Sequence, residues 1–308
     1  MMDYEKYLVR NPIYGSCSGS NNYQNPGMTY MSKVQVPEVN CYFEFAWIND
    51  PSKPNQQVSE HIHDFDEIIM QLGSDPNASR DLGAELELYI GGQPIAFNTT
   101  TSVFIPKGVP HGPVICKKFS KPIIQMVFLL GNGNYERKIR KNGSGSTPVV
   151  LPGKTSNIEY EEYIVRTPVR EVGRGVKNRQ MPTMTYMSRH LVLGANYYLE
   201  YGWIYGMPEP NPHVFEHIHN YDELVIHCGS DPDHPEDLGG EVEYCVNGQP
   251  LTFNTTSCLF IPKGLKHGPL TWRKFVRPHI EMTLIMGAGT LKEVWSADAF
   301  GGNQRDKR

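Results

Sequence analysis

The sequence predicts an all-β protein that contains two tandem copies of one domain, and three observations support this. The chain of 308 residues is about twice as long as a typical single domain. Aligned with itself at an offset of 156 residues, it matches residues 4–131 with 160–287 without a gap, and about 60 of these 128 pairs are identical. Each copy consists of short runs rich in β-branched and aromatic residues, separated by turn residues.

The repeat defines the domain organisation. A period of 156 residues is far too long for a solenoid or a propeller, so each copy is expected to have a complete core of its own. The segment between the copies is rich in Gly, Ser, Asn and Pro, which is typical of a linker. We therefore predict an N-terminal domain, a linker, a C-terminal domain and a tail, at residues 1–130, 131–157, 158–290 and 291–308.

The first copy contains five clear candidate strands, and no segment of helical length has a sustained period of 3.6 residues. The candidates are the runs CYFEFAWI, EIIMQL, ELELYI, SVFI and PIIQMVFLL, at residues 41–48, 67–72, 85–90, 102–105 and 122–130. Short strands at such intervals, with Gly and Pro between them, predict an antiparallel sandwich or barrel. A double-sheet jelly roll fits this number of strands.

Composition and charge narrow the function classes. A formal net charge of −4 without clusters of Lys and Arg argues against a nucleic-acid partner. No apolar run approaches the length of a membrane span, and the polar start MMDYEKYLVR is unlike a signal peptide. Six cysteines are scattered without a CxxC pair, which favours a reducing, cytoplasmic location.

Histidine and glutamate residues in the first copy have the spacing of a metal site. His61 and His63 lie two apart in EHIHDFDE, so on a strand their side chains point to the same face. Glu67 follows after a three-residue spacer, which allows a short turn to bring its carboxylate back to the same point. His111 comes directly after a turn in PKGVPHGP. We expect these four side chains to bind one divalent metal ion.

The second copy repeats the pattern with His217, His219, Glu223 and His267. Six of the eleven histidines of the chain fall in this pattern, which argues against ordinary core or surface histidines. Imidazoles and a carboxylate suit several divalent metals, and four protein ligands in an octahedral field leave two positions for water, substrate or dioxygen. We predict one ion per copy, with Fe or Mn expected and Ni, Co or Zn as alternatives.

The paired motifs resemble those of the cupin superfamily: HxHxxxE, followed 44 residues later by the histidine of IPKGxxH. The resemblance spans about 128 residues in each half and implies a bicupin, two tandem jelly-roll barrels whose ligands are the eight residues named above. The family usually has a glycine six residues before the first histidine. Here Asn55 and Asn211 stand in its place, which predicts a different local turn. The stretch through GSDP, DLG and ExE resembles that of uncharacterised two-domain cupins.

Three further titratable residues are candidate catalytic residues. Glu85 and Glu241 stand in alternating strands, from which each could hydrogen-bond a ligand histidine; a solvated strand face is the alternative. His227 replaces Gln71 of the first copy, and the same comparison adds His213, His279 and Glu281 in place of Gln57, Ile123 and Gln125. Because added acid–base groups are typical of a working active site, we expect the second copy to be the catalytic one.

The intact ligand sets favour an enzyme over a storage or structural protein. The leading hypothesis is a metal-dependent enzyme that acts on a small carboxylate, enol or phenol chelated to the ion, as a dioxygenase or a decarboxylase. The alternative is a non-catalytic, metal-dependent protein that binds a small ligand. A monomer that pairs its own domains and a homo-oligomer both agree with the duplicated sequence.

Overall fold

The computed structural model describes residues 3–15, 27–49, 60–134, 138–139, 159–171, 175–181 and 183–294. Most of the predicted linker 131–157 and tail 291–308 lies outside these ranges. The described residues are mainly β-strands, and their helical turns are short: η1 (Tyr4–Tyr7), η2 (Pro76–Ala78), η3 (Tyr160–Tyr163) and α1 (Leu291–Val294). None of these helices has the length and apolarity needed to cross a membrane.

Residues 12–167 form one compact unit, here called the N-terminal barrel. Its larger antiparallel sheet has the strand order β13 (Ile164–Val165), β9 (Thr101–Ile105), β6 (Asp66–Gly73), β11 (Ile123–Leu130), β4 (Cys41–Ile48), β3 (Met28–Met31) and β2 (Ile13–Tyr14). Its smaller sheet has the order β12 (Lys138–Ile139), β5 (His61–Ile62), β10 (His111–Phe119), β7 (Asp81–Ile90) and β8 (Gln93–Thr99). The five predicted runs correspond to β4, β6, β7, β9 and β11.

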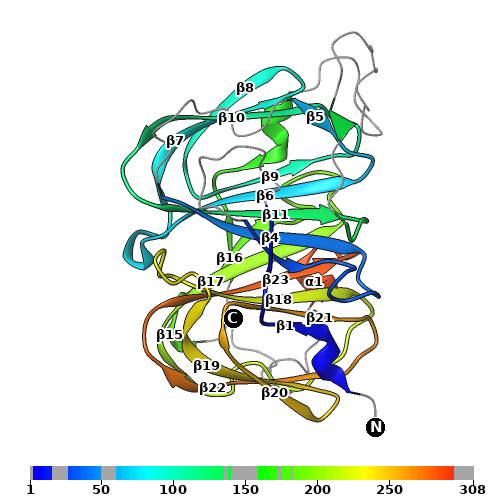
Figure 1. Ribbon diagram of the computed structural model, residues 1–308, viewed down its shortest axis with the longest axis vertical. Helices are drawn as coiled ribbons and strands as arrows, with labels where there is room; N and C mark the ends of the chain where they lie inside the picture. The colour runs from blue at the N-terminus through cyan, green and yellow to red at the C-terminus, as the bar shows by residue number, and fades with distance from the viewer. Residues whose placement is uncertain are drawn as a thin grey trace. The chain divides into compact units, whose positions relative to one another are not determined.

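Residues 1–11 and 168–308 form the second unit, the C-terminal barrel. Its larger sheet has the order β1 (Leu8–Val9), β21 (Ser257–Ile261), β18 (Asp222–Gly229), β23 (His279–Met286), β17 (Tyr197–Glu209), β16 (Thr183–Met187) and β14 (Val169–Glu171), with β15 (Lys177–Arg179) paired to β17. Its smaller sheet consists of β20 (Gln249–Thr255), β19 (Asp237–Val246) and β22 (His267–Phe275), which lie together in Figure 1. The predicted all-β fold with two tandem jelly-roll domains is confirmed.

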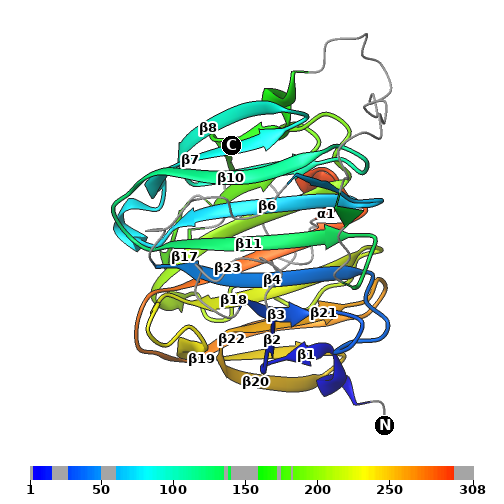
Figure 2. The same cartoon turned by 45° about the horizontal axis from the view of Figure 1, so that its top comes forward.

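The register of the larger sheet decides which residues share the barrel interior. Figure 2 shows β6, β11 and β4 side by side. In this register Glu67 lies opposite Leu129, and Leu129 lies opposite Tyr42. Residues directly opposite each other in antiparallel strands point to the same face, so these three side chains share one face of the sheet. The same holds in the C-terminal barrel for Glu223, Ile285 and Tyr198.

Each copy begins with a short arm, residues 4–10 in the first copy and 160–166 in the second. Each arm pairs with the barrel that the other copy forms. Leu8 lies opposite Leu259 in β21, and 156 positions later Ile164 lies opposite Val103 in β9. The predicted boundaries assign each arm to the copy that it precedes, whereas these contacts place it on the other barrel. The physical reason is that β21 and β9 would otherwise be edge strands with unpaired backbone groups.

Arginine side chains fix both arms. The guanidinium of Arg10 donates to the carbonyl oxygen of Thr252, with Nη2 at 2.7 Å, and pairs with the carboxylate of Glu5 at 2.6 Å. Arg166 makes the equivalent bonds to the carbonyl of Ala96 and to Glu161. Because the exchange is made by equivalent residues in both copies, it is a feature of the duplicated domain.

Candidate metal centres

The four predicted ligands of the first copy come together between the two sheets of the N-terminal barrel. His61 on β5 lies directly opposite His111 on β10, and their ring centroids are 4.1 Å apart. Glu67 approaches from β6 in the other sheet. One ligand atom from each of His61, His63, Glu67 and His111 lies within 4.8 Å of the others, and all four residues are buried.

Two backbone contacts explain how the sequence brings the second motif to the first. The amide of Gly108, in the IPKG turn, donates to the carbonyl oxygen of His63 at 2.7 Å. The amide of Lys107 donates to the Asp66 carboxylate at 2.9 Å. Gly108 has a φ of +78°, which favours glycine. The motif residues other than histidine and glutamate thus hold the turn that presents His111.

The C-terminal barrel repeats this arrangement. The backbones of His217 and His267 exchange two hydrogen bonds, of 2.8 and 3.0 Å, and their ring centroids are 4.1 Å apart. Ligand atoms of His217, His219, Glu223 and His267 again lie within 4.8 Å of one another. The turn contacts recur as well, from the amide of Gly264 to the His219 carbonyl at 2.8 Å.

The glycine after His267 is required by the packing of the site. Gly268 has a φ of +91°, and a Cβ there would collide with the carbonyl oxygen of Phe215. That same oxygen accepts a hydrogen bond from Nδ1 of His217 at 2.8 Å. Gly268 therefore allows the close backbone approach that orients a ligand imidazole.

The asparagine that replaces the usual family glycine in the second copy has a structural partner. The Asn211 side chain donates to the carbonyl of Trp272 at 2.8 Å and accepts from its amide at 2.9 Å. Asn55, at the matching position of the first copy, lies outside the described residues. In the second copy the side chain thus pairs with the neighbouring strand β22.

Backbone carbonyls set the orientation of the imidazoles. Nδ1 of His111 bonds to the Val109 carbonyl at 2.9 Å, and Nδ1 of His267 to the Leu265 carbonyl at 2.7 Å. Nδ1 therefore carries the proton, and the lone pair of Nε2 faces the glutamate. Within the described part of the chain, Nε2 of both residues is buried without a well-formed hydrogen bond. Such nitrogens beside a carboxylate fit a divalent metal ion.

The electrostatics of both groups favour an ionised glutamate. Burial raises the pKa of Glu67, but the neighbouring imidazoles of His111 and His63, at 2.8 and 3.4 Å from its carboxylate, outweigh this effect, so the pKa lies well below its usual value. Glu223 behaves in the same way through His219 and His267. Burial lowers the pKa of His217 to about 4, with the neighbouring His267 adding to the effect. A neutral imidazole and an ionised carboxylate are the forms that bind metal.

The structure does not bring Glu85 or Glu241 to these groups. Both alternate with buried residues of their strands, as Glu85 does with Leu86, so they point away from the barrel interior. The carboxylate of Glu85 pairs with the exposed Lys118 at 2.7 Å. The predicted alternation is present in β7 and β19, but alternation alone does not determine which face of a strand points into the barrel. We therefore propose no catalytic role for either glutamate.

His227 does lie in the interior of the C-terminal barrel. It is four residues from Glu223 on β18, so both side chains point to the same face of the strand, and it is 1% exposed. At the equivalent position Gln71 donates to Gln125 at 2.8 Å. Gln57, the counterpart of His213, lies outside the described residues.

A buried carboxylate that the sequence reasoning missed shares the face of each ligand glutamate. The Tyr42 hydroxyl donates to Glu44 at 3.0 Å, and the Tyr198 hydroxyl donates to Glu200 at 2.7 Å. Glu44 is 4% exposed and Glu200 is 8% exposed. An acidic residue at the same position of an apolar strand in both copies is the signal that could have identified them.

Comparisons with known proteins agree with this fold. No family model matches the sequence, and no curated protein matches it. Among solved structures, AerE from Microcystis aeruginosa is 12% identical with a TM-score of 0.54, over 91% of this chain and 99% of that one. A variant of Bacillus subtilis oxalate decarboxylase is 11% identical with a TM-score of 0.54, over 91% and 78%. Hazelnut (Corylus avellana) vicilin is 10% identical with a TM-score of 0.59, over 96% and 92%.

At these identities the likeness concerns the fold. It agrees with the two barrels and with the two groups of three histidines and one glutamate that the paired motifs form. The chain thus has the bicupin fold, two tandem jelly-roll barrels, and each barrel contains one such ligand group.

Proposed function

We propose that this chain is a metal-dependent enzyme that acts on a small oxygenated substrate, a carboxylate, enol or phenol, as a dioxygenase or a decarboxylase. The observation that carries the proposal is the pair of buried ligand groups, each with its ligand atoms within 4.8 Å of one another. A purely structural barrel has no need for such groups, because buried imidazoles and carboxylates cost free energy unless they bind something. The likeness to oxalate decarboxylase supports an enzymatic role.

The residues of each group fit one divalent ion. His61, His63, Glu67 and His111 would hold it in the N-terminal barrel, and their four counterparts in the C-terminal barrel. Bound there, the ion supplies Lewis-acid chemistry and, as Fe or Mn, the capacity to activate dioxygen. With these four residues as its ligands, the ion would also be able to bind a chelating carboxylate, enol or phenol.

Each barrel has a further buried carboxylate on the same interior face as its ligand glutamate. Glu200 shares the interior face with Glu223. Across the sheet it is level with Val225, two residues from Glu223, which corresponds to about 12 Å between the backbones of the two glutamates. The hydroxyl of Tyr198 lies between Glu200 and the hydroxyl of Thr185, at 2.7 and 3.1 Å. We propose that the Glu200 carboxylate holds or accepts the substrate proton and that Tyr198 orients it.

We propose the C-terminal barrel as the catalytic one. Its interior adds His227 and Glu281 where the N-terminal barrel has the neutral amides of Gln71 and Gln125. Titratable groups inside a barrel with a ligand group favour a working active site. The five cysteines of the described part are free, and we propose the cytoplasm as the location of the enzyme.

The test is a turnover assay on metal-loaded protein with panels of small carboxylates and phenols. Dioxygen uptake identifies a dioxygenase, and release of carbon dioxide without dioxygen uptake identifies a decarboxylase. Loss of turnover in His217→Ala, with turnover retained in the matched His61→Ala variant, is expected. Turnover in neither wild type nor variants, across both panels, contradicts the proposal.

A second candidate is a non-catalytic protein that binds a small ligand through its metal. The observation in its favour is the likeness to vicilin, which has the highest TM-score among the structures named above. Thermal protection of the metal-loaded protein by a carboxylate or phenol that is recovered unchanged would support this candidate over the enzyme.

A further inference from the structure

The C-terminal barrel contains a second group of buried polar side chains besides the ligand group. His213, His227 and His279 are 4%, 1% and 0% exposed, and Glu281 is 6% exposed. We call the imidazole cluster the set formed by these residues together with Arg179 and Trp272. At the matching positions the N-terminal barrel has neutral residues, among them Gln71, Cys116, Ile123 and Gln125.

Ionic contacts hold one side of the imidazole cluster. Nε of Arg179 donates to the Glu281 carboxylate at 2.8 Å, and the other carboxylate oxygen lies 3.3 Å from Nε2 of His213. The ionised Glu281 is thus paired with Arg179 and fixes the orientation of the His213 ring. Because Nε2 of His213 faces a carboxylate, Nε2 carries a proton and the opposite nitrogen, Nδ1, points away from Glu281.

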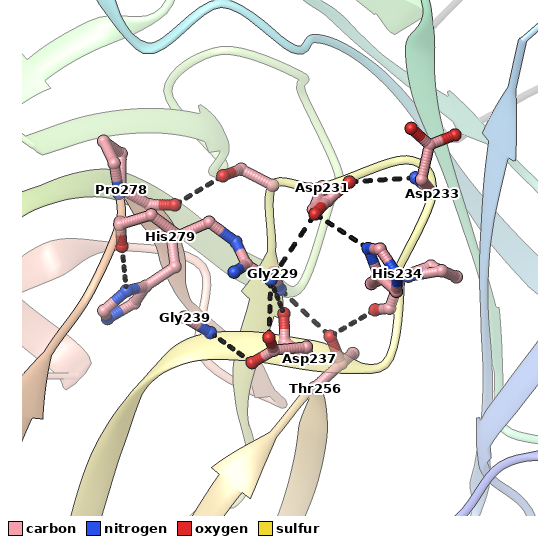
Figure 3. Close-up of polar contacts among 12 residues, drawn as sticks. Gly229, Asp231, Asp233, His234, Asp237, Gly239, Thr256, Pro278 and His279 are labelled. Carbon is pink, nitrogen blue, oxygen red and sulfur yellow. Dashed lines mark hydrogen bonds and ion pairs between the residues drawn. The ribbon is translucent and has the colours of Figure 1, made fainter.

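Hydrogen bonds between uncharged groups hold the other side of the imidazole cluster. Nε1 of Trp272 donates to Nε2 of His279 at 2.9 Å, and Nδ1 of His279 donates to the carbonyl of Arg277 at 3.0 Å. Figure 3 shows the His279 ring beside the loop that runs from Gly229 to Gly239. Both ring nitrogens of His279 are therefore used, so this histidine serves to position Trp272.

The segment that carries His279 is fixed by that loop. The amide of Gly239 donates to the Asp237 side chain at 2.9 Å (Figure 3). Nη2 of Arg277 pairs with the same side chain at 2.9 Å. The matching contact in the N-terminal barrel is Lys121 with Asp81, at 2.8 Å. The loop is therefore common to both copies, whereas the imidazole cluster is confined to the second.

Two ring nitrogens of the cluster have no hydrogen-bond partner among the described residues, Nδ1 of His213 and Nε2 of His227. Both rings contact Trp272, with centroid distances of 5.0 Å for His213 and 5.7 Å for His227. Buried polar groups of native proteins are nearly always hydrogen-bonded, so this pair of nitrogens indicates a polar group of a ligand.

The chemistry of the two nitrogens selects the ligand group. Burial lowers the pKa of His227 to about 3, so its imidazole is neutral at physiological pH. A carboxylate or phosphate is disfavoured, because Arg179 is already paired and Glu281 is negative. A hydroxyl group can donate to one imidazole nitrogen and accept from another. The cluster therefore fits an alcohol or phenol oxygen.

The imidazole cluster and the ligand group share one interior. Glu223 and His227 project from the same face of β18, four residues apart, which corresponds to about 13 Å between their backbones. On the smaller sheet Trp272 lies opposite Val242, two residues before Tyr244, whose ring stacks on His267 at 6.2 Å. A ligand held at both places would lie along these aromatic side chains.

We propose that the C-terminal barrel holds its substrate at two points, a chelating end at the Glu223 ligand group and a distal hydroxyl at His213 and His227. The proposal rests on the proposed function for the chelating end and adds the substrate class. That class is an elongated carboxylate or enol with a hydroxyl group at its far end. The N-terminal barrel has Gln71 and Gln125 at the matching positions and is expected to lack a distal hydroxyl site.

Calorimetric binding to the metal-loaded protein tests the two-point mode. The probes are pairs of carboxylates with and without a terminal hydroxyl: 4-hydroxycinnamate against cinnamate, and ω-hydroxyalkanoates against alkanoates of increasing length. We expect one range of length in which the hydroxyl strengthens binding about tenfold, as one buried hydrogen bond does. His227→Leu is expected to abolish this gain. The gain is the ratio of the two affinities of a probe pair measured on the same protein, so a general loss of affinity in the variant does not enter it.

The control variant is Gln71→Leu, at the matching position of the N-terminal barrel, which is expected to keep the gain. No hydroxyl preference at any length, or a preference that survives His227→Leu, overturns the two-point mode even if the carboxylates bind. If a water molecule alone pairs with the nitrogens of His213 and His227, no probe length gives a hydroxyl preference. Failure of the proposed function is seen separately, as ligands that bind with the expected preference and are never turned over.

Discussion

Gly240 lies against the ring of His279: a Cβ at residue 240 would come 3.0 Å from Cε1 of the imidazole. The N-terminal barrel has Ala84 and Ile123 at these two positions. The added imidazole of the second copy is thus accompanied by the loss of a methyl group on the neighbouring strand. The two residues differ between the copies as a pair, which is a physical sign that the imidazole cluster is a built feature.

This pair gives a double-mutant cycle. Gly240→Ala alone is expected to destabilise the C-terminal barrel by about 1–3 kcal/mol through overpacking. In a His279→Ile background the same change recreates the Ala84 and Ile123 pair of the first copy. There it should cost at least about 1 kcal/mol less. Urea unfolding of the four proteins measures this coupling. Equal costs in both backgrounds would show that the contact does not limit the packing.

Arg179 is expected to be essential because of the carboxylate beside it. Arg179→Met leaves Glu281 buried without its cationic partner, which should lower the free energy of unfolding by about 3–5 kcal/mol. Adding Glu281→Gln, the residue of the first copy, should recover a large part of this loss. The control is Lys118→Met, whose pair with Glu85 is 80% and 41% exposed and should change stability by less than about 1 kcal/mol. Chemical denaturation of wild type and the three variants distinguishes these cases.

The buried histidines predict a loss of stability in acid. Burial lowers the pKa of His227 to about 3 and that of His279 to about 4, from an ordinary value of 6.5. Below pH 6.5 the unfolded chain takes up protons that the folded chain does not, so each histidine lowers stability by about 1.4 kcal/mol per pH unit. The contribution is complete above pH 6.5 and falls as the pH approaches 4.

The measurement is urea unfolding at pH 7 and pH 5, where the carboxylates remain mostly ionised. Wild type should lose about 4 kcal/mol more than the His227→Gln, His279→Ile variant between the two pH values. Loss of the Trp272 hydrogen bond in the variant lowers stability at both values and does not enter this difference. The same loss in both proteins would mean that these imidazoles are not buried in the neutral form.

Glu200 is expected to act in proton transfer. Glu200→Gln preserves the shape of the side chain but removes its basicity, so turnover should fall by about 10²–10⁴-fold with metal content unchanged. The matched variant Glu44→Gln tests the other barrel and should have little effect if only the C-terminal barrel is catalytic. Turnover that survives Glu200→Gln would assign the residue to packing with Tyr198.

The strands and ligand groups could be predicted because their signals are local or repeated. The run at residues 41–48 matches β4 residue for residue. His61 and His63, two residues apart, contribute to the same ligand group, as their spacing predicts. The duplication mattered as much, since two copies of the same paired motifs make a chance match improbable. The fold and the metal ligands were therefore predictable from short local patterns and from their repetition in the second copy.

The remaining features depend on contacts that such patterns do not encode. Leu8 pairs with Leu259, which lies at the far end of the sequence. The strand β1 has only two residues, which is too short to give a sequence signal for this pairing. Glu85 and Glu44 show the limit of such patterns: Glu85 stands in an alternating strand and lies on its outer face, whereas Glu44 stands in the apolar run of β4 and lies inside the barrel. Which face is buried follows from packing between sheets.

Metal content tests the central claim most directly. Elemental analysis of purified wild type, His61→Ala and His217→Ala, each reconstituted with Fe or Mn, should give about two ions per chain in wild type and about one in each variant, as one centre per barrel requires. A circular dichroism spectrum of each protein confirms that it is folded. Folded wild-type protein that retains no metal after reconstitution would contradict the account.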